Sequence, residues 1–177
     1  MKRFLPLAAL LAATPVMAQQ APHADPNPGV TAAREVWTQA HNYVTKSAEQ
    51  MPEEKFSFRP VDSVRTFGEL VGHVAGAEMM FCAAALGEKV PGEDAVEKTA
   101  KTKADLVAAL KKSADYCARA YALTDAGASS PLTIFGMKMS GLGVLTLNAA
   151  HDYEHYGNIV TYLRINGMVP PSSQPAR

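Results

Sequence analysis

The chain has 177 residues, enough for one domain, and it carries equal numbers of basic and acidic residues, 17 of each. This balance excludes the basic footprint of a nucleic-acid-binding protein, so we expect no nucleic acid partner. The two cysteines, Cys82 and Cys117, lie in neither a CxxC nor a CxxCH pattern. Thioredoxin-type redox catalysis and covalent c-type haem are therefore disfavoured.

Residues 1–18 have the pattern of a secretory signal peptide. Lys2 and Arg3 precede a short apolar run from Phe4 to Val16, which is shorter than the roughly 20 residues needed to cross a bilayer. An uncleaved anchor or a buried helix fits less well, because polar, proline-rich sequence follows at once. We expect a periplasmic or secreted protein with no membrane contact after cleavage. Fifteen basic residues then face seventeen acidic ones, a formal net charge of −2.

Residues 19–30 contain prolines and no apolar periodicity, which predicts a flexible tether with a solvated His23. The first helix is predicted over residues 31–51, where Pro52 stops it. Its apolar residues recur at helical spacing and form one face: Ala33, Val36, Trp37, Ala40, Val44, Ala48 and Met51. His41 lies near the polar edge of this helix, and we expect it to face solvent.

The second helix is predicted from Thr66 to Leu86, with Gly87 ending it. Thr66 and Glu69 have the spacing of a capping box, in which each side chain binds a free backbone N–H group of the first turn. Residues 87–101 form a long connector that contains Pro91 and Gly92.

The third helix is predicted to begin near Thr102, with Asp105 three residues later. Residues 124–139 form a glycine- and serine-rich connector whose apolar side chains are expected to fold back onto the bundle: Leu132, Ile134, Phe135 and Met137. The fourth helix is predicted over residues 140–165, and residues 172–177 form a polar tail. No strand pattern competes, so the bundle is expected over residues 31–171, as an all-α fold.

Three histidines form the candidate site. His151 and His155 are four residues apart, so both imidazoles lie on one face of the fourth helix and can reach one ion. His73 lies on the inward stripe of the second helix, between Gly72 and Gly76. Two glycines in a helix cost about 1 kcal/mol each relative to alanine, which suggests close packing around something.

Inward histidines are often hydrogen-bonded core residues rather than ligands. Three neutral imidazoles in one apolar core would each need a partner, however, and a single divalent ion satisfies all three. Among the acidic candidates, Glu69 could be a fourth ligand, although its capping role fits better. Asp152 and Glu154 are expected to support the ligands or lie at the surface. Asp152 also stands where a zincin protease has its glutamate base, so that class fits poorly.

Two segments resemble the DinB/YfiT-like metalloprotein family. One is Phe67-Gly68-Glu69-Leu70-Val71-Gly72-His73-Val74-Ala75, and the other is His151-Asp152-Tyr153-Glu154-His155-Tyr156-Gly157-Asn158. Residues 51–56, 162–167 and 170–172 extend the resemblance over most of the chain after the tether. The resemblance implies a four-helix bundle in up-down-down-up order, with a long crossover between helices 2 and 3.

The resemblance also implies that His73, His151 and His155 hold a divalent ion, which could be zinc, nickel, iron or manganese. Some members transfer low-molecular-weight thiols or isomerise thiol adducts, and many have no known activity. We therefore expect either a metal-dependent hydrolase or transferase acting on a small molecule, assisted by Asp152, Glu154 or Tyr156, or a non-catalytic metal-binding or stress-related protein. A homodimer formed through an exposed helix face is a further expectation.

The up-down-down-up order makes helices 2 and 3 parallel. Cys82 and Cys117 each lie shortly before the end of their helix, so this order places them at the same height. A disulfide between them is therefore expected, and an oxidising compartment permits it. Two small buried thiols are the alternative.

Overall fold

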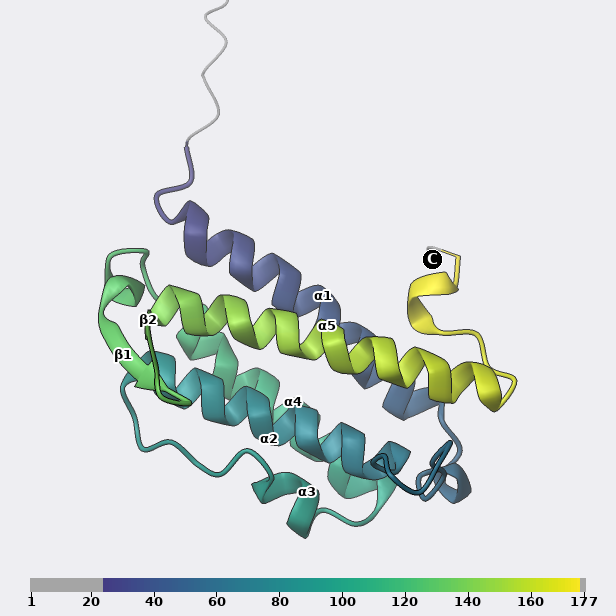
Figure 1. The fold of residues 1–177 in the computed structure, drawn as a ribbon. Helices are drawn as coiled ribbons and strands as arrows, with labels where there is room; N and C mark the ends of the chain where they lie inside the picture. The colour runs from purple at the N-terminus through teal and green to yellow at the C-terminus, as the bar shows by residue number, and fades with distance from the viewer. Residues whose placement is uncertain (1–23, 176–177) are drawn as a thin grey trace, which may run out of the picture.

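The computed structural model describes residues 24–175 and contains a bundle of four long helices (Figure 1). They are α1 (Pro28–Gln50), α2 (Phe67–Leu86), α4 (Lys103–Ala120) and α5 (Gly141–Ile165). The predicted signal peptide, residues 19–23 of the predicted tether with His23, and the last two residues lie outside the described residues.

The helix directions follow from contacts between residues near the helix ends. Ala48, near the end of α1, shares a core cluster with Phe67 at the start of α2, and Ala33, near the start of α1, shares one with Cys82 late in α2, so α1 and α2 are antiparallel. The same clusters place Leu145, early in α5, with Ala33 and Leu163, late in α5, with Ala48, so α1 and α5 are parallel. Cys82 and Cys117, both late in their helices, form a disulfide, so α2 and α4 are parallel. The expected long crossover, residues 87–101, runs along α2 (Figure 1). The bundle has the predicted up-down-down-up order.

Side-chain caps define where two of the helices start. Thr66 and Glu69 form the predicted capping box, with the Thr66 N–H donating to Glu69 Oε2 at 2.7 Å. Thr102 and Asp105 form a second capping box at the start of α4. Each box satisfies backbone N–H groups that have no partner within their own helix.

The first helix starts three residues earlier than predicted, at Pro28. The backbone N–H groups of Gly29 and Val30 donate to the Asp125 carboxylate at 2.9 and 2.8 Å. Asp125 thus caps a helix about 95 residues away in sequence, which no local pattern reveals. Val36, predicted in the core, is 47% exposed.

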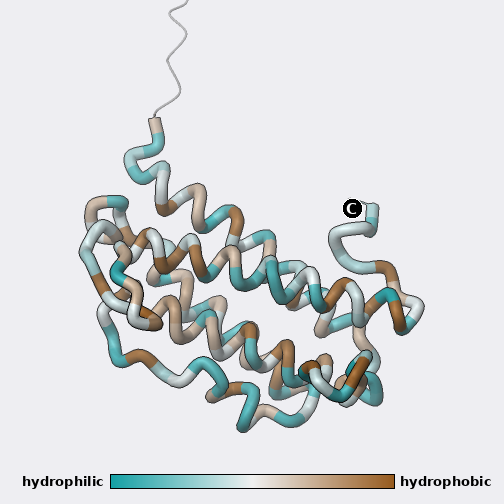
Figure 2. Tube along the Cα trace, viewed as in Figure 1, coloured by the Kyte–Doolittle hydropathy of each residue, from teal (hydrophilic) through white to brown (hydrophobic). Residues whose placement is uncertain are grey.

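Helix α2 is the central helix of the bundle, and most of its residues are buried. Among the described residues it alone has the length and composition of a membrane-crossing helix. Its most apolar window is 78% buried inside the bundle. Apolar residues also recur along the other long helices (Figure 2).

Both long connectors contain regular structure that the sequence did not reveal. The crossover includes a short helix, α3 (Ala95–Thr99). The connector before α5 contains a hairpin of β1 (Pro131–Ile134) and β2 (Met137–Ser140), paired antiparallel. Three short 3₁₀ helices complete the elements: η1 (Glu53–Lys55), η2 (Gly127–Ser129) and η3 (Pro171–Ser173).

The hairpin turns at Phe135 and Gly136, whose φ angles are 51° and 74°. Two consecutive positive φ angles are typical of a tight two-residue turn. Ile134 is buried as predicted, whereas Phe135 and Met137 are 58% and 47% exposed. Although Phe135 is more than half exposed, its ring meets Phe81 of α2 edge-on, with the ring centroids 5.9 Å apart, so the prediction that it folds back onto the bundle is confirmed.

Candidate metal centre

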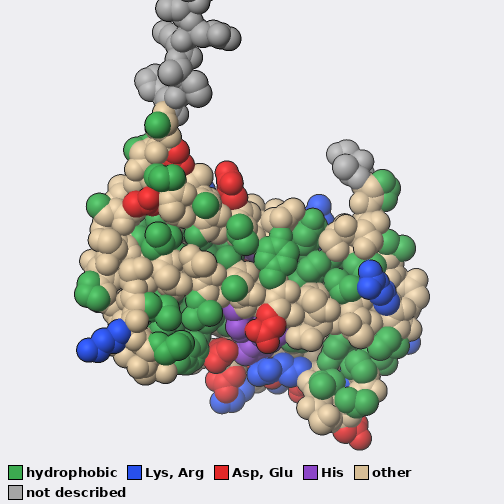
Figure 3. Space-filling model, turned by 45° about the horizontal axis from the view of Figure 1, so that its top comes forward, with side chains coloured by type: hydrophobic (Ala, Val, Ile, Leu, Met, Phe, Trp, Pro, Cys, Tyr) green, Lys and Arg blue, Asp and Glu red, His purple; other side chains and the backbone are tan. Residues whose placement is uncertain are grey.

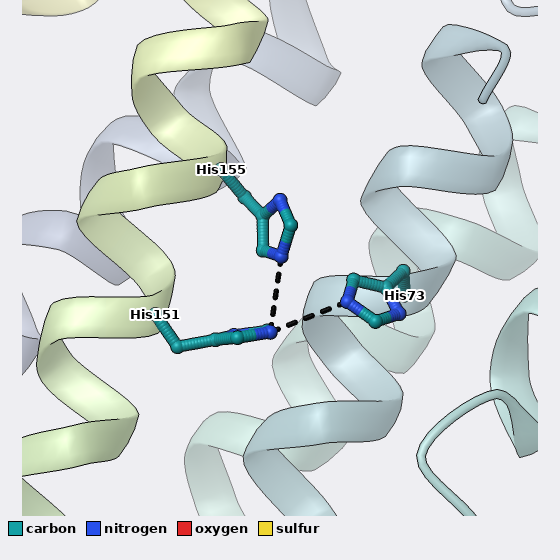
Figure 4. A group of neighbouring side chains, drawn as sticks. All are labelled: His73, His151 and His155. Atoms are coloured by element: carbon teal, nitrogen blue, oxygen red, sulfur yellow. Dashed lines mark hydrogen bonds between the residues drawn. The ribbon is translucent and has the colours of Figure 1, made fainter. Parts of the chain in front are cut away.

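His73, His151 and His155 come together between α2 and α5 (Figure 4). The Nε2 atom of His151 lies 3.2 Å from Nε2 of His73 and 3.0 Å from Nε2 of His155. When one nitrogen is taken from each ring, the three nitrogen atoms all lie within 4.8 Å of one another. The four-residue spacing places two rings on one side of α5, and the antiparallel α2 supplies the third.

The polar atoms of this cluster are poorly satisfied by the protein alone. The Nδ1 atoms of all three rings are buried without a hydrogen-bond partner among the described residues. Burial, the positive charge of Arg65 and the neighbouring imidazole of His151 lower the pKa of His73 to about 4. Burial and the two neighbouring histidines lower the pKa of His155 to about 3, and burial also lowers the pKa of His151. The rings are therefore neutral at pH 7, the form that binds metals.

Charged side chains surround the histidines where they reach the surface (Figure 3). The Glu93 carboxylate, from the crossover, lies 3.4 Å from Nε2 of His73 and 3.7 Å from Nε2 of His151. Glu97 Oε2 lies 3.6 Å from Nδ1 of His73, and both Glu97 oxygens accept hydrogen bonds from Arg65 Nε. The sequence pointed to neither carboxylate, because both belong to the connector.

Gly72 and Gly76 explain how the crossover comes so close to His73. A Cβ atom on Gly76 would lie 2.1 Å from the carbonyl oxygen of Glu93, and one on Gly72 would lie 2.9 Å from Cα of Glu97. The predicted close packing beside His73 is therefore packing against the crossover backbone. These two glycines are the sequence signal of a close approach at this point, although they do not identify the segment that makes it.

A cavity of about 450 Å³ borders the cluster at His155. Its walls come from the connector between α1 and α2 and from the second half of α5. Val61, Val64 and Tyr162 give it an apolar side, and Arg65 adds one positive charge. A small molecule in this cavity would lie beside His155, one of the three histidines.

The other residues considered from sequence have different surroundings. The Glu69 carboxylate binds the Thr66 backbone, as the capping prediction required. Glu154 is exposed, and the Tyr156 hydroxyl donates to Ser172 Oγ at 2.7 Å. Asp152 is fully buried, with one oxygen 3.9 Å from Nδ1 of His151. Of the three expected helpers, Asp152 alone is seen beside a site histidine.

His41 is buried, so the prediction that it faces solvent is wrong. Its Nδ1 atom lies 2.8 Å from Oε1 of Glu78, a fully buried carboxylate. Trp37 Nε1 donates to the same oxygen at 2.9 Å, and the Ser113 hydroxyl donates to Oε2. His41 is stabilised inside the bundle by a partner on another helix. We call Glu78, Trp37, His41 and Ser113 the Glu78 cluster.

The fold and the site together define a four-helix-bundle protein of the three-histidine type. The chain belongs to the DinB superfamily, whose profile matches residues 36–159. No curated protein matches the sequence as a relative.

Solved structures share this fold at low sequence identity. A DinB-like protein from Bacillus cereus has a TM-score of 0.68 at 19% identity, covering 80% of this chain and 95% of its own. YfiT from Bacillus subtilis, described as a probable metal-dependent hydrolase with an unusual four-helix bundle topology, has a TM-score of 0.64 at 16% identity, covering 87% and 97%. A mycothiol-dependent maleylpyruvate isomerase has a TM-score of 0.61 at 17% identity, covering 73% and 60%.

The residues present fit a divalent metal ion. Three neutral imidazoles present their Nε2 atoms to one point, while buried Nδ1 atoms remain without partners. Bound imidazoles commonly donate their other N–H to a carboxylate, and Glu97 and Asp152 lie nearest to the Nδ1 atoms of His73 and His151.

Proposed function

We infer that this protein is an exported metal-dependent hydrolase that holds one divalent ion through His73, His151 and His155. The observation that carries this inference is the convergence of three Nε2 atoms beside a cavity of about 450 Å³. An ion with three histidine ligands keeps at least one position for another ligand. When bound, it would supply Lewis-acid activation of a substrate oxygen or sulfur.

The protein's own residues would bind and orient a small substrate. The apolar wall of the cavity would hold its body beside His155. Similarity of fold to YfiT, described as a probable metal-dependent hydrolase, supports hydrolysis. Thiol transfer is the second candidate, because the fold is also that of a mycothiol-dependent isomerase.

Export is part of the proposal. The Cys82–Cys117 disulfide supports it, because such bonds form and persist in oxidising compartments. Low-molecular-weight thiols belong mainly to the reducing cytoplasm, which favours hydrolysis over thiol transfer for an exported protein.

The test begins with metal analysis of the full chain purified from its native compartment. The protein is then stripped with a chelator, reloaded with zinc, nickel, iron or manganese, and assayed on ester, phosphoester and amide substrates and on a thiol adduct. We expect turnover of a hydrolysable substrate that depends on metal and is lost in His155→Ala. Stoichiometric metal with no turnover of any substrate would favour the non-catalytic alternative, and absence of metal would refute the site.

A further inference from the structure

We propose that Glu93 is a fourth protein ligand for the ion, so that the crossover between α2 and α4 closes one side of the site. This inference rests on the proposed function, because it concerns the same ion. It changes the site from three nitrogen donors on two helices to three nitrogens and one carboxylate oxygen, with the oxygen supplied by a connector.

The distances between the Glu93 carboxylate and the histidine nitrogens fit ligands of one shared ion better than hydrogen bonds between the side chains. Glu93 Oε1 lies 3.4 Å from Nε2 of His73 and 3.7 Å from Nε2 of His151. These separations exceed the usual 2.7–3.2 Å of a hydrogen bond to nitrogen. Two donor atoms that each lie ~2.0–2.2 Å from one tetrahedral ion are roughly 3.3–3.6 Å apart. The carboxylate therefore lies at ligand–ligand distance from two of the three nitrogens. It stands outside the group of histidine donor atoms that all lie within 4.8 Å of one another, so a change of its side-chain rotamer would bring it to the ion.

The neighbouring acidic residues already have cationic partners, whereas Glu93 does not. Glu97 accepts two hydrogen bonds from Arg65 Nε, at 3.1 and 3.2 Å. Asp94 pairs with Lys98 at the surface. Among the described residues, the ion pairs of Glu93 are with His73 and His151 alone, and its side chain is 35% exposed. A metal ion bound by the two histidines would provide the positive charge that this partly buried carboxylate faces.

The fold fixes the position of Glu93 through its backbone. The Glu93 carbonyl oxygen occupies the space that a side chain on Gly76 would fill, at 2.1 Å from the Cβ position. Gly76 lies on α2 three residues after His73, so the same short helical segment positions a histidine ligand and the backbone of the carboxylate. The contact makes the crossover a fixed part of the site.

The fourth ligand leaves a route for substrate. Glu93 approaches His73 and His151, whereas the cavity borders His155. Three histidines and one carboxylate would fill a tetrahedral ion, whereas an ion that expands to five or six ligands keeps a free position for substrate. A carboxylate oxygen favours manganese, iron, nickel or zinc over copper(I). Glu93 would thus shape metal selectivity without occluding the cavity.

The test compares Glu93→Gln with Asp94→Asn, which removes one charge from the next residue of the same connector. Zinc affinity of the full chain is measured by competition with a chromophoric chelator, and cobalt(II) spectra report the ligand set. We expect Glu93→Gln to bind zinc at least about tenfold more weakly and to change the cobalt spectrum. Asp94→Asn should match wild type in both measurements. Equal affinities and spectra for Glu93→Gln and wild type would overturn the inference.

A second pair of variants moves Glu93 without removing it. Gly76→Ala forces the crossover backbone away, whereas Gly157→Ala on α5 meets nothing within 4 Å. We expect Gly76→Ala to weaken zinc binding and Gly157→Ala to leave it unchanged, with both variants folded by circular dichroism. If wild type binds no metal, the proposed function fails together with this inference. If wild type binds metal and both Glu93→Gln and Gly76→Ala bind it equally well, this inference alone fails.

Discussion

Two buried polar clusters lie inside the same bundle, and they differ in how completely their atoms are paired. In the Glu78 cluster, both carboxylate oxygens accept hydrogen bonds, from Trp37, His41 and Ser113. In the histidine cluster, three Nε2 atoms face one another and three Nδ1 atoms lack partners within the described residues. Both clusters contain inward histidines, so a buried histidine does not by itself distinguish structure from function.

This difference in hydrogen-bond pairing indicates which cluster is suited to bind a ligand. A satisfied buried network specifies the packing of its helices and needs nothing further. An unsatisfied one costs free energy unless something outside the chain completes it. Asp152 lies between the two clusters. Burial and the adjacent charge of Glu78 raise the pKa of its carboxyl well above the usual range.

The largest expected effect is on metal affinity, and it should differ between histidines of the two clusters. His151→Ala removes the ring whose Nε2 lies closest to both others, and metal affinity should fall by roughly a thousandfold, one ligand's share of the ~10–16 kcal/mol typical of structural zinc sites. His41→Gln removes a buried histidine of the Glu78 cluster and should leave affinity unchanged. Chelator competition measures both, and equal losses in the two variants would erase the distinction.

The next effect concerns stability near the Glu78 cluster. The Cys82–Cys117 disulfide links residues 35 apart in sequence, and its removal in a Cys82→Ala/Cys117→Ala variant should cost about 3 kcal/mol of the free energy of unfolding. Urea denaturation of the metal-free protein measures this loss. Metal affinity should remain that of wild type, because neither cysteine touches the histidine cluster. A loss of affinity would show that the clusters are coupled.

The smallest effect is a pH dependence. Burial opposes protonation of His41, but the hydrogen bond and charge of Glu78 outweigh it and raise the pKa of His41. The resulting stabilisation is fully present below about pH 6.5, the unfolded value, and is lost as pH rises through the folded value. In the metal-free protein, the free energy of unfolding of wild type should therefore exceed that of His41→Gln. This excess should be larger at pH 6 than at pH 9, by on the order of 1 kcal/mol. A constant difference across this range would contradict the His41–Glu78 pairing.

The bundle could be predicted because its determinants are local. The caps at Thr66 and Thr102 and the spacing of His151 and His155 are each visible within a few residues. The helix order and the disulfide followed from the family resemblance, and the structure contains both.

What could not be predicted depends on contacts between distant segments. His41 is buried because Glu78, 37 residues away, pairs with it. Glu93 reaches the site because the crossover packs on Gly76, and the glycine indicates a close approach without naming the segment that makes it. The hairpin strands have only four residues each, and β1 starts at a proline, which gives too little alternation to predict strands.

The central claim is that the three histidines hold one divalent ion, and anomalous diffraction from crystals of the zinc-loaded full chain tests it most directly. The account predicts one strong peak per chain within ~2.0–2.1 Å of Nε2 of His73, His151 and His155. A peak at another set of side chains, or none at these three in zinc-saturated crystals, would contradict it.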